Sequence, residues 1–270
     1  MRLWYNLTVM KRLLFTAAAA AMLVSVCVLG GCAVGEAHVE YTLSEDGTHY
    51  IVSGVTGDIR GLTKLEVPET YGEEGSLLPV TEIGDEAFFR CTRLVEAKIP
   101  QTIERIGVRA FARCSFSEFV IPDRVKVIDD GAFGMCDNLK EITVPESVET
   151  LAVRAFYACS SLQKAVIKAQ ITVLDRYTLY NTVPSQGGNV YMHSSLTQVY
   201  LPATLEKIEI SALYGNPVTD IYFAGSESAW NSLYFYELVE KEGKEDEYEE
   251  KVYEKSKVLG SAKVHLNAEF

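Results

Sequence analysis

The sequence predicts a solenoid, a coil of short stacked repeats that each contribute a strand-like segment. The phrase Ala-Phe-x-x-Cys occurs four times, and its cysteines lie 23, 22 and 23 residues apart. A strand-like phrase of apolar residues recurs in the same phase as these cysteines. A unit of this length cannot bury an apolar face alone, so neighbouring units must stack to create the core.

Composition allows one sizeable core, because 48% of the 270 residues are hydrophobic and 10% are aromatic. The pattern divides the chain into four parts. Residues 1–31 are expected to be a signal peptide, 32–61 a linker and hairpin cap, 62–223 a coil of about seven rungs, and 224–270 a C-terminal cap.

The amino terminus has the features of an export signal. Lys11 and Arg12 precede an apolar run from Leu13 to Leu29, which is followed by Gly30-Gly31-Cys32. Leu-Gly-Gly-Cys resembles the lipobox of bacterial lipoproteins, which implies diacylglycerol on Cys32, bacterial origin and an extracytoplasmic, lipid-anchored protein. An uncleaved anchor and a conventionally secreted chain are the alternatives. Met10 also provides a normal start for such a signal.

The net charge argues against nucleic acid as a partner. Removal of the leader leaves 22 basic and 37 acidic side chains, a net charge of about −15. Binding to nucleic acid requires a basic stripe that releases counterions, and this composition supplies none.

The repeat cysteines are interpreted as core residues. Their common phase places them inward, as a ladder of thiols that pack as small hydrophobes beside the phenylalanines of the same phrase. Parallel Cβ directions disfavour disulfides between rungs, and the spacing is wrong for zinc. The predicted structural ladder comprises Phe88, Cys91, Phe111, Cys114, Phe133, Cys136, Phe156 and Cys159.

A hairpin is expected before the first rung. The apolar stretches His38 to Leu43 and Tyr50 to Val52 flank Asp46-Gly47, a dipeptide typical of tight β-turns. This hairpin would cover the open end of the coil and protect its strand edge.

Seven strand-like phrases follow, and a proline closes most of them. Proline cannot donate a hydrogen bond to a ladder and therefore ends a strand. The phrases are Leu62 to Val67, Leu94 to Ile99, Phe116 to Ile121, Leu139 to Val144, Leu162 to Ile167, Leu196 to Leu201 and Val218 to Phe223.

Two further segments complete each rung. A second apolar pair, such as Val125 and Ile128, predicts a short strand or turn. The four-residue spacing of Ala110 and Cys114 then predicts one helical turn on the far side of the coil.

The pattern L-x-x-I-x-I-P-x-x-V-x-x-I-G-x-x-A-F-x-x-C resembles the BspA-type leucine-rich repeat of bacterial surface proteins, over residues of about 60 to 223. Tyr222 to Asn231 is similar to the family's closing phrase, and Ala262 to Asn267 to its terminal strand. The resemblance implies a β-rich, horseshoe-like leucine-rich-repeat solenoid with a parallel sheet on the concave face, short helical turns on the convex side, a hairpin cap and a helix and strand cap. It implies a right-handed coil and no catalytic residues.

Two insertions interrupt the period. The surplus residues lie in Tyr71 to Pro79 and around Pro184 to Gly188. Both are expected to be loops that leave the coil, either as tolerated insertions or as carriers of function.

The C-terminal cap is expected to begin with a helix. Ser226 is a suitable N-cap, and Trp230, Leu233, Tyr234 and Leu238 would share one helical face that covers the last rung or binds a partner. From 237 to 257, acids and lysines at i,i+4 spacing predict a solvated helix or loop.

No catalytic or cofactor-binding motif is recognised, and neither a metal nor a cofactor is expected. The four histidines are scattered over separate segments, namely His38, His49, His193 and His265. The adjacent carboxylates Asp129 and Asp130 are expected to point apart.

The concave wall is the predicted binding face. Alternation directs the third and fifth residues of each strand phrase outward. Early rungs interleave opposite charges, whereas later rungs align β-branched and tyrosine side chains, which indicates either cross-strand packing or a binding stripe. The candidate ligand-binding residues are Val120, Thr143, Val166, Gln198, Tyr200, Asp220 and Tyr222.

These observations predict a monomeric, lipid-anchored surface protein that recognises another protein by non-covalent contact, as in adhesion. The alternatives are an envelope scaffold that organises other surface proteins and an accessory protein that captures glycans on its tyrosines.

Overall fold

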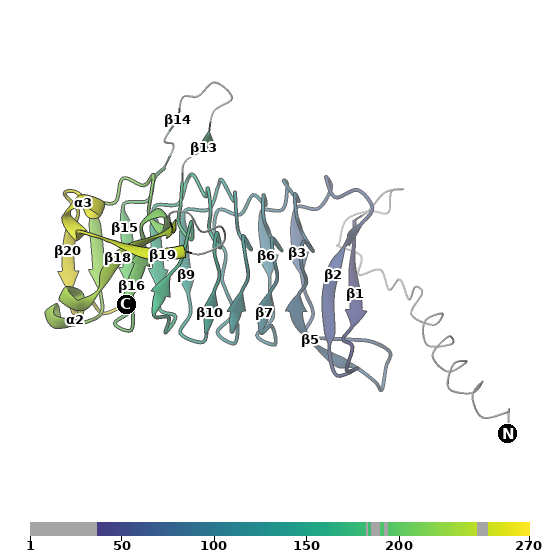
Figure 1. The fold of residues 1–270 in the computed structure, drawn as a ribbon. Coiled ribbons are helices and arrows are strands. Elements are labelled where there is room, and N and C mark those ends of the chain that lie inside the picture. Colours follow the sequence, from purple (N-terminus) through teal and green to yellow (C-terminus); the bar gives the residue numbers. More distant parts are fainter. Residues whose placement is uncertain (1–36, 182, 185–189, 192–193, 242–247) are drawn as a thin grey trace.

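A computed structural model describes residues 37–181, 183–184, 190–191, 194–241 and 248–270. The chain forms one solenoid that advances from the hairpin end to the C-terminal end (Figure 1). The predicted leucine-rich-repeat architecture with parallel sheets is confirmed. The signal segment, including Cys32, lies outside the described residues. Within the described ranges, no helix is long and apolar enough to cross a bilayer.

The predicted strand phrases line one wall of the coil, which we call the first sheet although its hydrogen bonding falls into two parts. β3 (Lys64–Glu66) pairs in parallel with β6 (Glu96–Lys98). The third phrase was expected to form a strand but contributes only one bridge, between Glu118 and Glu141. A five-stranded parallel sheet then comprises β9 (Glu141–Val144), β11 (Lys164–Ile167), β15 (Gln198–Leu201), β17 (Asp220–Phe223) and β20 (Lys263–Leu266).

The predicted hairpin is present and extends a second sheet. β1 (His38–Leu43) pairs antiparallel with β2 (Tyr50–Thr56), and Gly47 in their turn has a φ of 71°. β2 pairs in parallel with β5 (Leu78–Ile83). At this contact a Cβ on Gly84 would lie 2.8 Å from the Val52 carbonyl oxygen, so only glycine allows the approach.

The second apolar pair of each rung forms the rest of this second sheet. Three strands of two residues continue it in parallel, namely β7 (Arg105–Ile106), β8 (Val127–Ile128) and β10 (Thr150–Leu151). Later rungs form a separate sheet of β12 (Val173–Leu174), β16 (Lys207–Glu209), β18 (Tyr234–Glu240) and β19 (Tyr248–Tyr253).

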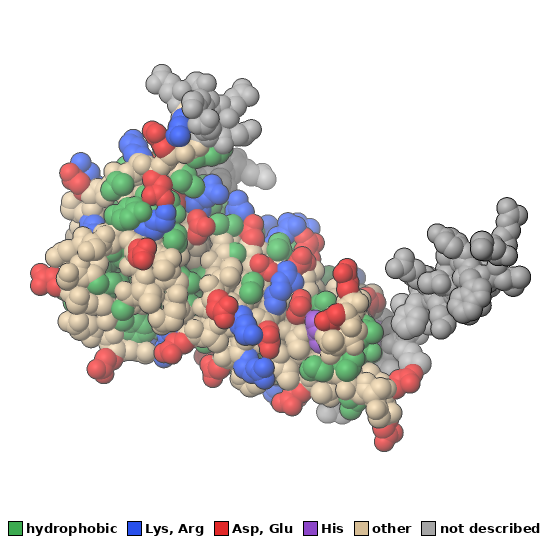
Figure 2. Space-filling model, turned by 60° about the horizontal axis from the view of Figure 1, so that its bottom comes forward, with side chains coloured by type: hydrophobic (Ala, Val, Ile, Leu, Met, Phe, Trp, Pro, Cys, Tyr) green, Lys and Arg blue, Asp and Glu red, His purple; other side chains and the backbone are tan. Residues whose placement is uncertain are grey.

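Opposite charges meet between neighbouring rungs on the outer surface. Figure 2 shows acidic and basic side chains interspersed along the coil. Arg105 lies 2.7 Å from Asp129 and 2.8 Å from Asp85. Asp130 instead pairs with Arg154 at 2.9 Å, so the adjacent carboxylates serve different partners. Such partly exposed pairs contribute about 0–1 kcal/mol each.

The third wall consists of turns built on the Ala-Phe-x-x-Cys phrase. The Ala110 amide donates to Gly107 O at 3.1 Å and the Cys114 amide to Phe111 O at 3.2 Å, so two β-turns stand where one helical turn was expected. Arg109 and Arg113 have φ values of 51° and 65°, and these left-handed residues prevent the turn from growing into a helix. Among the described residues, a 3-10 helix is reached only in the sixth rung, as η1 (Ile210–Ala212).

Turn amides link one rung to the next. Phe88 N–H donates to Ala110 O at 2.8 Å, Phe111 N–H to Ala132 O at 2.8 Å, and Phe133 N–H to Ala155 O at 2.9 Å. These bonds satisfy buried backbone groups that neither sheet pairs. The turn wall therefore acts as a third hydrogen-bonded ladder.

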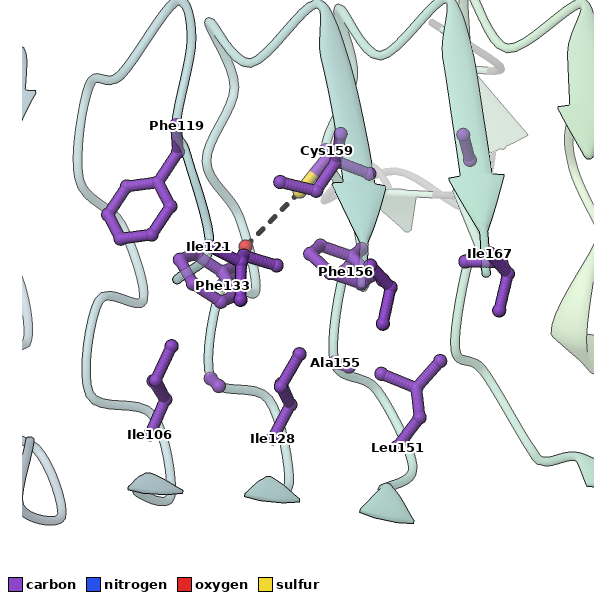
Figure 3. Close-up of a cluster of buried hydrophobic side chains, with 14 of the residues drawn as sticks. Ile106, Phe119, Ile121, Ile128, Phe133, Leu151, Ala155, Phe156, Cys159 and Ile167 are labelled. Atoms are coloured by element: carbon purple, nitrogen blue, oxygen red, sulfur yellow. Dashed lines mark hydrogen bonds between the residues drawn. The ribbon is translucent and has the colours of Figure 1, made fainter. Parts of the chain in front are cut away.

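The phenylalanines of the phrase stack through the core. Ring centroids are 5.3 Å apart for Phe88 and Phe111, and 5.5 Å apart for Phe111 and Phe133 and for Phe133 and Phe156. Each ring is at most 1% exposed. Figure 3 shows Phe133 and Phe156 side by side between the walls of the coil.

The four repeat cysteines are buried and free. Each later thiol donates to the carbonyl oxygen of a phenylalanine in the preceding rung. The distances are 3.4 Å for Cys114 to Phe88 O, 3.3 Å for Cys136 to Phe111 O, and 3.2 Å for Cys159 to Phe133 O. Figure 3 shows the last of these bonds. The thiols are thus core groups with their own polar partners.

The two insertions are hairpins. β4 (Thr70–Tyr71) pairs antiparallel with β5, and Tyr71 stacks on Tyr41 of the first hairpin at 4.1 Å. β13 (Val183–Pro184) pairs antiparallel with β14 (Val190–Tyr191), and this pair projects from the coil (Figure 1). Most of the insertion between these strands, and His193, lie outside the described residues.

The C-terminal cap differs from its prediction. α2 (Glu227–Ser232) begins at Ser226, whose Oγ accepts from Ala229 N–H at 3.2 Å as expected. It ends before Tyr234 and Leu238, which lie in β18. The expected single helical face was therefore wrong from Leu233 onward, although Trp230 and Leu233 are buried.

The segment expected as a charged helix or loop forms a β-hairpin where it is described. β18 and β19 pair Glu237 with Lys251 across the strands. The reason is that β18 also pairs with β16 and thereby buries Phe235 and Tyr236. A short helix, α3 (Lys255–Leu259), then leads to β20. Tertiary pairing outweighs the i,i+4 charge pattern.

We expect the four ladder thiols to be unreactive in the folded chain at about pH 8. Burial raises the pKa of Cys91 to about 11 and that of Cys159 to about 12, and it raises the pKa values of Cys114 and Cys136 as well. Iodoacetamide labelling followed by peptide mass spectrometry should modify these cysteines only after denaturation. Rapid labelling of the folded chain would contradict the ladder.

The same shifts predict a loss of stability in alkali. Thiols of the unfolded chain ionise near the ordinary pKa of 9.0, whereas the folded thiols stay protonated. The free energy of unfolding should therefore fall as pH rises from about 9 through 11 to 12, as measured by urea denaturation. Replacement of Cys136 by Ala should reduce this pH dependence.

Candidate binding face

The outward side chains of the first sheet form two rows. In the early rungs these residues pair with one another, with Lys64 Nζ 2.6 Å from Glu96 and Lys98 Nζ 3.9 Å from Glu66. All four are well exposed. The opposite charges at this end of the face pair with one another in solvent and leave no patch of one sign that would attract a ligand.

The later rungs carry an aromatic column. Strand register places Tyr200 beside Tyr222, and Tyr222 beside His265 of β20. The Tyr200 and Tyr222 rings stack at 4.2 Å and 8°, and Tyr222 and His265 stack at 4.5 Å and 12°. We call Tyr200, Tyr222 and His265 the aromatic column. All three side chains are half-buried.

The neighbouring row is charged and polar. Register aligns Glu141, Lys164, Gln198, Asp220 and Lys263. Lys164 Nζ lies 5.2 Å from the centre of the Tyr200 ring, a cation–π contact. Acidic and basic side chains therefore both border the aromatic column.

A hydrogen-bond network fixes the end of the column. His265 Nε2 lies 2.8 Å from Asp220 Oδ1, and the Thr219 hydroxyl donates to Asp220 Oδ2 at 2.8 Å. The hydrogen bonds from His265 and Thr219 lower the pKa of Asp220. Desolvation, followed by repulsion from Tyr200 and Asp220, raises the pKa of Tyr222. Asp220 is thus an anion and Tyr222 a neutral hydrogen-bonding group near neutral pH.

The valines do not share one environment. Val120 is 80% exposed, whereas Val166 is only 7% exposed. Val166 was expected to contribute contact area, but it lies between Thr143 and Tyr200 on neighbouring strands and is nearly covered. Val166 therefore lies beside Tyr200 at the end of the column, and Thr143 remains exposed.

Sequence reasoning missed two aromatic members of this face. His265 continues the column because β20 repeats the alternation of β17 as Lys263-Val264-His265-Leu266. That alternation could have identified it. Phe270 packs edge-on against Tyr200 at 5.3 Å, and no pattern in the last residues indicates this return of the chain.

A shallow hollow lies beside Phe270. It has a volume of about 330 Å³ and is lined by residues that include Glu146, Lys168, Gln170 and Phe270. Its lining mixes both charges with an amide. It widens the polar border of the face next to Tyr200.

Nothing in the described ranges is arranged for metal chemistry. No group of three or more His, Cys, Asp or Glu side chains within those ranges could hold a metal ion. The face offers stacking, hydrogen-bonding and charged groups.

A family model supports this architecture. The BspA type leucine-rich repeat region matches residues 76–185 and 181–240, in six copies. No curated protein sequence matches the chain.

Solved structures of bacterial leucine-rich-repeat proteins are similar to the chain. The pneumococcal vaccine antigen PcpA has a TM-score of 0.51 at 16% identity, covering 72% of this chain and 45% of that chain. This likeness concerns the fold alone. A leucine-rich-repeat protein from Bacteroides ovatus has a TM-score of 0.43 at 20% identity, covering 72% of this chain and 58% of its own. One from Bacteroides capillosus has a TM-score of 0.41 at 28% identity, covering 50% and 96%. The chain thus spans less than two thirds of the first of these relatives.

Proposed function

The chain belongs to the BspA-type leucine-rich-repeat family, and we propose that it binds another protein at the cell surface through the aromatic column and its charged border. The observation that carries this proposal is the stacked, half-buried file of Tyr200, Tyr222 and His265 on an outer sheet face. Recognition of this kind needs no catalytic group, so we propose a binding protein and not an enzyme.

The column is suited to protein contact because it is already ordered. Stacking on both sides of Tyr222 restricts its ring before any partner arrives, so binding costs little additional side-chain entropy. Tyrosine combines a large apolar area with a hydroxyl, the combination found at interface hot spots. The stacking also stabilises the sheet by about 0.2–1 kcal/mol per cross-strand pair.

The geometry favours protein over glycan as the ligand. A sugar ring stacks on an open aromatic face, but both faces of Tyr222 are occupied by Tyr200 and His265. What the column offers is ring edges, hydroxyls and flanking charges from Lys164, Asp220 and Lys263. A glycan-capturing role is therefore the weaker alternative.

We propose that Cys32 carries a lipid that holds the chain on the membrane. The first described residue, Ala37, is five positions after Cys32 and leads into β1. β1 lies at the opposite end of the coil from β20 (Figure 1). An anchor at Cys32 would thus place the aromatic column at the distal end, where a partner on another surface could reach it.

The adhesion and envelope-scaffold roles share this geometry and differ in the partner. Adhesion requires a protein of a host or of a neighbouring cell. A scaffold requires endogenous surface proteins. The distal position of the column in the anchored chain favours adhesion.

Replacement of Tyr200 and Tyr222 together by Ala should abolish partner capture with only a modest fall in melting temperature, because the stacking that is lost stabilises the sheet by about 0.2–1 kcal/mol per cross-strand pair. Capture is measured by pull-down from host matrix and from the producer's envelope, with a glycan array in parallel. Tyr248→Ala is the control, since Tyr248 is 56% exposed on β19.

Three results would count against parts of the proposal. Equal loss of capture and of melting temperature would leave the column a purely structural role. Capture of endogenous envelope proteins alone would favour the scaffold over adhesion. Binding confined to the glycan array would favour the glycan role.

Cys32→Ala should release the protein into the medium or leave an unprocessed precursor in the membrane, because the acylated side chain is lost. Metabolic labelling with a fatty-acid analogue, followed by fractionation, measures both outcomes. Unchanged processing and membrane retention would contradict lipid anchoring. Cys27→Ala is the matched control.

A further inference from the structure

We propose that a groove on the turn wall binds an acidic, aromatic-containing peptide segment of a partner protein. The groove has a volume of about 680 Å³. Its lining comes from the Ala-Phe-x-x-Cys turns of successive rungs and from the equivalent turn of the fifth rung, all outside the β-strands. The site is independent of the aromatic column.

The groove exists because one repeat position changes size along the coil. The residue after each ladder phenylalanine is large in the first and fourth rungs, as Phe89 and Tyr157, but small between them, as Ala112 and Gly134. All four residues line the groove. Phe89 and Tyr157 thus form two walls, and Ala112 and Gly134 form the floor.

Four arginines surround this floor. Arg90, Arg109, Arg113 and Arg154 line the groove, and Asp130 is the one acidic residue in its lining. All four arginines have left-handed backbones, with φ values between 51° and 65°. The turn geometry therefore fixes the direction in which each side chain leaves the wall.

Two of the four arginines form ion pairs with acidic side chains of the same chain. Arg154 pairs with Asp130 at 2.9 Å, and Arg109 pairs with Glu86. Arg90 and Arg113 have no ion pair within the described ranges. Two exposed guanidinium groups are thus available to carboxylates, in a chain whose net charge is −12.

The walls add aromatic surface. The guanidinium carbons of Arg90 and Arg109 lie 5.2 and 5.5 Å from the centre of the Phe89 ring. On the other wall Tyr157 stacks on Tyr180 at 5.5 Å and 4°. Arginine held against an aromatic ring binds carboxylates through a planar fork of donors, and Arg, Tyr and Met are enriched in protein interfaces.

The lining selects against sugars and nucleic acids. It contains no Asn, Gln, Ser, Thr or His side chain, so sugar hydroxyls would find few paired donors and acceptors. A polyanion would meet the repulsion of a net-acidic protein on either side of the groove. A short peptide with a few acidic side chains and an aromatic one matches both the charge and the apolar walls.

The test uses the full chain in detergent micelles and a fluorescein-labelled peptide of alternating Glu and Tyr. Fluorescence anisotropy should show binding of this peptide, and weaker binding of Ser–Tyr and Lys–Tyr peptides. Arg113→Ala should weaken binding of the Glu–Tyr peptide by about tenfold, because each arginine–carboxylate pair has that effect. Arg124→Ala is the control, since Arg124 is exposed and lies outside the groove lining.

Gly134→Tyr tests the groove itself without changing the charge. The repeat already accepts Phe89, Tyr157 and Tyr180 at this position, with the same turn hydrogen bond to the residue three positions earlier. The variant should therefore fold, as checked by its melting temperature. It should fill the floor and reduce binding by more than tenfold.

Several outcomes would overturn the proposal. These are no binding of the Glu–Tyr peptide, equal binding of the Ser–Tyr peptide, unchanged binding by Arg113→Ala or by folded Gly134→Tyr, and displacement of the peptide by polygalacturonate at equal carboxylate concentration. The Tyr200→Ala, Tyr222→Ala double variant should bind the Glu–Tyr peptide normally. Loss of peptide binding in that variant would contradict a site on the turn wall.

Discussion

The stacking of one phenylalanine per rung sets the register on which the rest of the coil depends. Ring spacings of 5.3 to 5.5 Å between Phe88, Phe111, Phe133 and Phe156 are close to the spacing of neighbouring strands in a sheet. The same residues link the rungs through backbone amides, and they accept hydrogen bonds from the cysteine thiols. The ring stacking, the amide hydrogen bonds and the thiol hydrogen bonds all align each rung with the next at the same residues. This shared role explains why the four copies of the motif vary so little.

A fixed phase assigns each repeat position to one wall. The fifth residue of the strand phrase always faces outward from the first sheet, and in late rungs this places Tyr200, Tyr222 and His265 in contact. The residue after each ladder phenylalanine always faces outward from the turn wall, so small residues at Ala112 and Gly134 open a groove there. Both proposed binding surfaces are thus variations at solvent-facing positions of an otherwise constant core.

The constant positions were predictable from the sequence, and the variable ones only in part. The buried ladder, the N-terminal hairpin and the strand phrases follow from period and alternation. The β18–β19 hairpin was not predicted, because Glu237 and Lys241 fit a helix equally well and only the pairing of β18 with β16 decides between them. The groove combines residues of several rungs, so no single stretch of sequence indicates it. The contact between Phe270 and Tyr200 depends on how the last residues fold back onto the sheet, which no sequence pattern indicates.

Amide hydrogen exchange tests the ladder most directly. The amides of Phe88, Phe111, Phe133 and Phe156 should be among the most slowly exchanging in the chain, because each is buried and bonded to the next rung. Phe133→Ala should destabilise the fold by about 3–5 kcal/mol and lower protection in the rungs on both sides. The account would be contradicted if these amides exchanged as fast as those of the β1–β2 hairpin. It would also be contradicted if Phe133→Ala lowered protection only in the rung of Phe133.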